Sequence, residues 1–159
     1  MRQLLKFLHT MGAIGLMGAM VCLLVLLITA PPTTSLKEYV TTRLAMSAIA
    51  TWIFLPSLGV TLVAGLLAIA ANRVYQNAGW AWVKLASGIL LFEGGFTGIV
   101  GPMQDEAEKS SNVLSGHDQL EAVGQSIVAE QNTLWLLLAV ATANVALGIW
   151  RLRLTRLPD

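Results

Sequence analysis

The chain has 159 residues, of which 55% are hydrophobic and 12% are charged, and its formal net charge is +1. Soluble domains carry about 25% charged residues, so the composition argues against a soluble protein, and the balanced charge argues against a nucleic-acid partner. One cysteine excludes a disulfide framework within the chain. Four long apolar stretches leave no room for a separate soluble domain. We therefore expect a single transmembrane domain over residues 1–159, with the lipid bilayer as its main partner.

The first apolar stretch covers residues 4–29, and it is uncharged from Thr10 to Ala30. This run is as long as the roughly 20 residues needed to cross a bilayer. One side of the expected helix is thin because it carries three glycines, Gly12, Gly15 and Gly18. Small residues let helices approach closely in lipid. We expect this Gly/Ala-rich face to contact another copy of the chain or other membrane subunits.

The remaining spans are expected over residues 44–71, 80–101 and 133–150. Pro56 lies near the middle of the second span and should kink that helix. Trp80 and Trp82 are typical interfacial anchors at the start of the third span. Gly98, Gly101 and Pro102 should end the helix of the third span, because proline cannot continue the helical hydrogen bonding.

Residues 103–132 form the long loop that remains, and nearly all its charged side chains are acidic. Ser115 and Gly116 should separate a first helical piece from a second. In the second half, apolar residues recur at helical spacing: Leu120, Val123, Ile127 and Val128. The expected fold class is all-α, a transmembrane four-helix bundle with an amphipathic helix in the long extracytoplasmic loop.

The basic residues are distributed unequally between the two ends of the spans. One side has Lys37, Arg43 and Lys109, and the other has Arg2, Lys6, Arg73, Arg151, Arg153 and Arg156. The positive-inside rule places the richer side in the cytoplasm. We expect a multi-pass protein of the bacterial inner (cytoplasmic) membrane, with both termini cytoplasmic and the acidic loop outside.

Ionisable residues inside apolar spans are costly and are candidates for function. His9 and Lys84 lie near the cytoplasmic ends of the first and third spans, where they could line one pocket. Neutral imidazole is the commonest metal ligand, so His9 is a candidate axial ligand of a haem iron, with Lys84 pairing with a propionate. The alternative is an interfacial histidine with one hydrogen bond and a lysine that extends its ammonium to the surface.

Glu93 lies near the middle of the third span, about 13–14 Å deeper than Lys84 along the helix. A carboxyl group at this depth should be uncharged or paired, and Asn144 in the fourth span, at a comparable depth, could hydrogen-bond it. Glu93 is either a proton carrier, a contact to a cofactor, or a hydrogen-bonded structural group in a glycine-rich helix.

Two segments, LLKFLHTMGAIGLMGA and GWAWVKLASGILL, carry a resemblance to known membrane proteins. They match a Leu-His in a Gly/Ala-rich first span and a Gly-Trp-x-x-x-Lys-Leu motif that opens the third. The chain resembles an uncharacterised family of four-span integral membrane proteins. That family is similar to the copper-resistance D proteins and to the membrane-bound, oxygen-independent protoporphyrinogen oxidases. Length, the Gly-Pro after the third span and the Trp-Arg-x-Arg after the fourth also fit the four-span family.

The resemblance to the oxidases implies roles for two residues. Their first-span histidine is implicated as a haem b ligand and their third-span lysine as essential, and these positions correspond to His9 and Lys84. If the chain is an enzyme, the resemblance implies an oxidoreductase of the protoporphyrinogen oxidase type.

Three hypotheses for function follow. The first is a membrane module that binds haem b through His9 and Lys84 and acts in redox chemistry or as an accessory subunit. The second is a structural or assembly subunit of a larger membrane complex without a cofactor. The third is metal or proton transport centred on Glu93 and the methionines.

Overall fold

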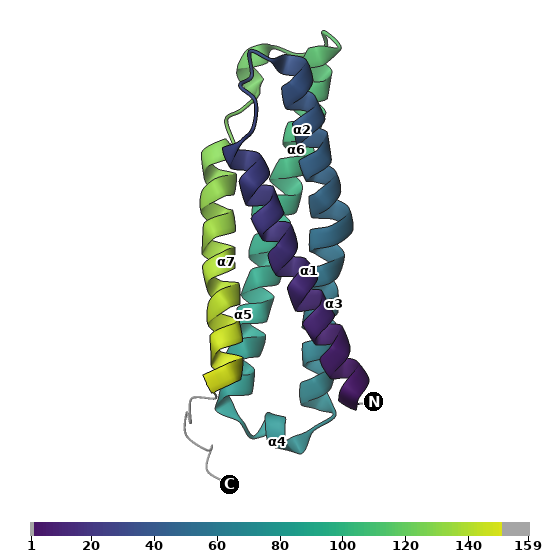
Figure 1. Ribbon diagram of the computed structural model, residues 1–159, viewed down its shortest axis with the longest axis vertical. Helices are drawn as coiled ribbons and strands as arrows, with labels where there is room; N and C mark the ends of the chain where they lie inside the picture. The colour runs from purple at the N-terminus through teal and green to yellow at the C-terminus, as the bar shows by residue number, and fades with distance from the viewer. Residues whose placement is uncertain (1, 151–159) are drawn as a thin grey trace.

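The computed structural model describes residues 2–150, and these residues form helices joined by short turns (Figure 1). In chain order the α-helices are α1 (Arg2–Ile28), α2 (Leu36–Ile49), α3 (Leu55–Ala70), α4 (Arg73–Gln76), α5 (Gly79–Gly95), α6 (Gly101–Leu114) and α7 (Ile127–Trp150). Two π-helical turns, η1 (Ala50–Phe54) and η2 (Phe96–Val100), and one 3₁₀ turn, η3 (Leu120–Ala122), complete the described part. No strand occurs within it, so the prediction of an all-α fold is confirmed.

Within the described part of the chain, four helical segments are long and apolar enough to cross a membrane: Gln3–Ile28, Leu36–Ala70, Gly79–Leu114 and Ile127–Ile149. They pack side by side as an elongated bundle, and α1 begins at the same end at which α7 stops (Figure 1). This arrangement supports the predicted polytopic membrane protein. Three arginines used to orient it, Arg151, Arg153 and Arg156, lie outside the described residues.

Two prolines sit inside the long helices, each just after a π-helical turn. Pro56 follows η1, and Pro102 follows η2 at the start of α6. A proline lacks the N–H that would bond to the carbonyl four residues earlier, and a local π turn is one way to accommodate the loss. The prediction that the helix ends at Gly101 and Pro102 is therefore wrong, because it continues through them to Leu114.

The expected amphipathic helix in the second half of the 103–132 loop is not seen. The break at Ser115 and Gly116 is present, but residues 115–126 form turns with only the short η3. Gly116 and Gly124 adopt positive φ angles of 77° and 85°, a conformation that interrupts a helix and that glycine tolerates. Ile127 and Val128 belong to the first turn of α7 instead.

The bundle is held together by a continuous apolar core between α1 and the other long helices. Its fully buried side chains include Met20, Leu23, Phe54, Ile99 and Leu134. Helix α1 crosses the bundle diagonally, from beside α3 at the end near α4 toward α7 at the opposite end (Figure 1). At the end near α4 a cavity separates α1 and α3 from α5 and α7.

Two glycines bring α1 close to α3. A Cβ atom on Gly12 would overlap the Thr61 hydroxyl and lie 3.0 Å from the Ser57 carbonyl oxygen, and one on Gly15 would crowd the Ser57 hydroxyl. Gly18 has no neighbour within 4 Å of its Cβ position. Of the three glycines expected to contact a partner, two are therefore used inside the chain.

Candidate binding cavity

A cavity of about 270 Å³ lies between α1, α3, α5 and α7 near the α4 end of the bundle. Most of its lining is aliphatic, including Leu16, Leu58, Leu62, Leu85 and Leu91. The polar groups in its wall come from all four helices: Lys6, His9, Thr61, Trp80, Lys84 and Asn144. A mostly apolar wall with a small number of polar groups that point into the cavity is typical of small-molecule sites.

His9 is fixed in one orientation by α3. Its Nδ1 lies 2.9 Å from the backbone carbonyl oxygen of Thr61. Because a carbonyl oxygen only accepts, Nδ1 carries the proton, and in the neutral ring Nε2 keeps its lone pair. The ring packs over Gly65, where a Cβ atom would lie 3.6 Å from Nδ1. The side chain is therefore preset to ligate a metal or accept a hydrogen bond through Nε2.

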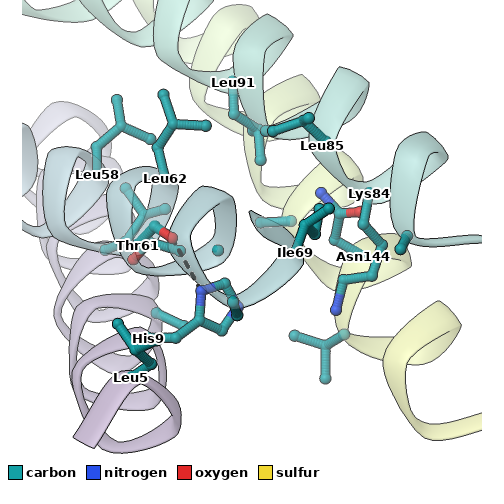
Figure 2. Close-up of a pocket in the computed structure, with 18 of the residues that line it drawn as sticks. Leu5, His9, Leu58, Thr61, Leu62, Ile69, Lys84, Leu85, Leu91 and Asn144 are labelled. Carbon is teal, nitrogen blue, oxygen red and sulfur yellow. Dashed lines mark hydrogen bonds between the residues drawn. The ribbon is translucent and has the colours of Figure 1, made fainter. Parts of the chain in front are cut away.

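Lys84 extends from α5 into the same cavity, on the side opposite His9 (Figure 2). Its ammonium nitrogen packs close to Gly148 of α7, 2.8 Å from the position of a Cβ atom there. Among the described residues, no carboxylate forms an ion pair with it. A partly buried cation without a counter-charge favours an anionic group as its partner.

Asn144 lies beside Lys84 rather than beside Glu93. Its Oδ1 accepts a hydrogen bond of 2.7 Å from the Ser87 hydroxyl, so the expected pair with Glu93 is wrong. The reason is that α5 and α7 run in opposite directions. Asn144 is six residues before the end of α7 and therefore lies level with the first turns of α5. The pair fixes the Asn144 amide in the cavity wall.

Glu93 lies outside the cavity. Its side chain is exposed on the outer surface of α5, where neighbouring exposed side chains are apolar. The methionines differ in burial. Met20 and Met46 are buried in the core, while Met11 is exposed. Among the residues that the structure describes, no three His, Cys, Asp or Glu side chains come together as a metal site.

A second polar cluster, at the opposite end of the bundle, was not foreseen. Arg43 of α2 is 1% exposed, and its Nη1 donates to Glu130 Oε2 of α7 at 2.6 Å. Its Nε donates to the Tyr39 hydroxyl at 3.0 Å, and that hydroxyl donates to Glu106 Oε1 of α6 at 2.7 Å. Gly124 N–H also donates to Glu106 Oε1, at 2.6 Å. We call Tyr39, Arg43, Glu106 and Glu130 the Arg43 network.

The Arg43 network joins three helices and the 115–126 segment. Within the described residues, no buried side-chain nitrogen or oxygen atom lacks a hydrogen-bond partner. A buried ion pair whose groups are all satisfied fixes the register of the elements it connects. The sequence did contain a hint of this pairing, since the basic Arg43 and the acidic 103–132 loop were predicted to lie on the same side of the membrane.

Comparisons of the chain with protein-family models, curated proteins and solved structures gave no match. The properties of the cavity therefore rest on its own geometry: an oriented imidazole and an unpaired ammonium group in an apolar wall.

Proposed function

We propose that the protein is a multi-pass protein of the bacterial inner membrane that binds haem b in the cavity, with His9 as the axial ligand and Lys84 as the partner of a propionate. The orientation of His9 carries this proposal. An Nδ1–H held by a backbone carbonyl is the usual arrangement of metal-ligating histidines, and His9 has this hydrogen bond in a largely apolar cavity.

The donor set suits a haem better than a bare metal ion. One imidazole would be enough to hold a haem iron, because the macrocycle brings its own nitrogen ligands. A copper or zinc ion would need several protein ligands, and the described residues offer no such group. When bound, haem would supply one-electron redox chemistry.

The size of the cavity sets a condition on this proposal. Its volume of about 270 Å³ is just below the roughly 300–1,000 Å³ of small-molecule pockets, and a tetrapyrrole is a large ligand for a pocket of this size. Binding therefore requires the walls to move apart or part of the ring to stay outside. Lys6 and Val145 are the exposed members of the lining and mark where the cavity opens.

The test is a dithionite-reduced minus oxidised visible spectrum of the protein purified in mild detergent, followed by titration with haemin. We expect a haem b α-band in the wild type and its loss in His9→Ala. His117→Ala is the matched control, because His117 is exposed in the turn after α6, far from the cavity. Lys84→Met should weaken binding roughly 10- to 100-fold, the value of one charge-assisted hydrogen bond, without changing the band position.

Two results would contradict the haem proposal. The first is a flat spectrum from folded wild-type protein that also fails to bind added haemin. The second is an α-band of equal height in His9→Ala. The first result would leave the chain as a structural or assembly subunit without this cofactor, and the second would mean that a residue other than His9 ligates the haem iron.

A further inference from the structure

Glu93 lies near the middle of the apolar stretch between Lys84 and Gln104. On the continuous helix formed by α5, η2 and α6, Lys84 and Gln104 are 20 residues apart. At 1.5 Å per residue this separation is about 30 Å, the thickness of the hydrocarbon core. Glu93 is nine residues from Lys84 and eleven from Gln104, so its carboxyl group is close to mid-depth.

The side chain of Glu93 points away from its own bundle. It is exposed, and most of the large side chains around it on the outer face of α5 and η2 are exposed and apolar: Ile89, Leu90 and Phe96. Lipid cannot hydrogen-bond a carboxyl group, and leaving it unpaired there is costly. Contact with lipid would therefore leave the Glu93 carboxyl group without a hydrogen-bond partner.

No described part of the chain satisfies this carboxyl group. The nearest hydroxyl along the helix, that of Thr97, donates to the backbone carbonyl of Glu93 instead. No described lysine or arginine lies at the depth of Glu93, because the membrane-spanning parts of α1, α3 and α7 carry none between their ends. The Ser87 and Asn144 side chains are already paired with each other.

We propose that the outer face of α5 around Glu93 is the contact surface for a second copy of this chain, with the two Glu93 carboxyl groups hydrogen-bonded to each other. Copies inserted in the same orientation carry Glu93 at the same depth, so a second copy brings the required polar group to the right level. A neutral carboxyl group has one donor and one acceptor side. A two-fold axis along the membrane normal then pairs both groups reciprocally.

This surface differs from the glycine face of α1. Gly12 and Gly15 already contact α3 of the same chain, whereas the α5 face is unused within the bundle. Interhelical hydrogen bonds between polar side chains stabilise association in membranes. The aliphatic and aromatic neighbours of Glu93 would supply the packing around the pair.

The experiment compares three forms of the full chain by sedimentation in detergent over a range of protein-to-detergent ratios. We expect the wild type to dimerise and Glu93→Gln to remain dimeric, because a carboxamide also has a donor and an acceptor side. Glu93→Leu should raise the dimer dissociation constant roughly 10- to 100-fold, as expected for the loss of two such bonds. Glu108→Leu is the matched control, since Glu108 is exposed on α6 beyond the membrane core.

Disulfide crosslinking in membranes tests the geometry independently. In a Cys22→Ser background, Leu90→Cys should crosslink two copies, whereas Leu136→Cys, equally exposed on α7, should not. The proposal is overturned if the wild type is monomeric at every ratio, if Glu93→Leu dimerises like the wild type, or if Leu136→Cys crosslinks as readily as Leu90→Cys.

Discussion

At the scale of single residues, Arg43 has the strongest set of partners in the described chain. Its guanidinium group is buried against Glu130 and Tyr39, and Glu106 is held by Tyr39 and by the Gly124 N–H. Removing the cation would leave Glu130 buried without its counter-charge. Loss of one partner of a buried ion pair costs about 3–5 kcal/mol. Arg43→Met should therefore lower the thermal unfolding midpoint in detergent substantially, as followed by tryptophan fluorescence.

Lys37→Met is the matched control for Arg43→Met. It makes the same replacement of a cation by methionine on the same helix, but Lys37 is exposed and should change the free energy of unfolding by less than about 0.5 kcal/mol. A double variant, Arg43→Met with Glu130→Leu, should recover part of the loss because no charge of that pair remains buried. Equal midpoints for Arg43→Met and Lys37→Met would show that the Arg43 network contributes nothing to stability.

The residues of the cavity were only partly predictable from the sequence. His9 and Lys84 are polar interruptions near the same ends of two apolar stretches, and the structure places both in one cavity. The partner of Asn144 was missed because depth was counted without the opposite directions of α5 and α7. Thr61 was missed because its contribution to His9 is a backbone carbonyl, which leaves no mark in the side-chain pattern.

At the scale of helices, the boundaries differ most from prediction where polar residues are buried. The second span was expected to start at residue 44, but α2 starts at Leu36. A hydropathy pattern ends a span at its first charged residue, which here is Arg43. The helix nevertheless includes Tyr39 and Arg43, because their side chains hydrogen-bond to Glu106 and Glu130. Helices α2 and α6 therefore extend past the ends of α1 and α7 (Figure 1).

The contact between α1 and α3 depends on the absence of a side chain at Gly12. In Gly12→Ala the added methyl group would meet the Thr61 hydroxyl and backbone, which cannot move without displacing α3. Overpacking of this kind costs about 1–3 kcal/mol. We expect a lower unfolding midpoint and weaker haemin binding, because the Thr61 carbonyl that orients His9 belongs to the same contact.

Gly18→Ala is the control for the α1–α3 contact. It adds the same methyl group to the same helix, but nothing lies within 4 Å of the new atom. Alanine is also the better helix former by about 0.8–1.0 kcal/mol, so the midpoint should stay unchanged or rise. A fall in the midpoint as large as that of Gly12→Ala would mean that Gly18 also contacts something, such as a second copy of the chain.

At the scale of the whole molecule, composition and hydropathy were enough to predict four spans and an all-α bundle, since each span is long and apolar in itself. The continuation of the third long helix to Leu114 was not predictable from the sequence, because a Gly-Pro pair such as Gly101 and Pro102 usually ends a helix. It depends on the preceding π turn and on Glu106, whose contacts hold α6 against α2. The tendency of Gly101 and Pro102 to end a helix was therefore overridden by contacts between residues far apart in the sequence.

The orientation of the bundle in the membrane is a prediction from its charged ends. Helix α1 begins and α7 stops at the end that also holds α4, and this end carries Lys6 and Arg73. Single cysteines in a Cys22→Ser background test it, with Ser115→Cys and Asn77→Cys as two exposed positions at opposite ends. If the positive-inside rule holds, a membrane-impermeant maleimide should label Ser115→Cys in intact cells. It should label Asn77→Cys only after permeabilisation, and the reverse pattern would place the cavity on the extracytoplasmic side.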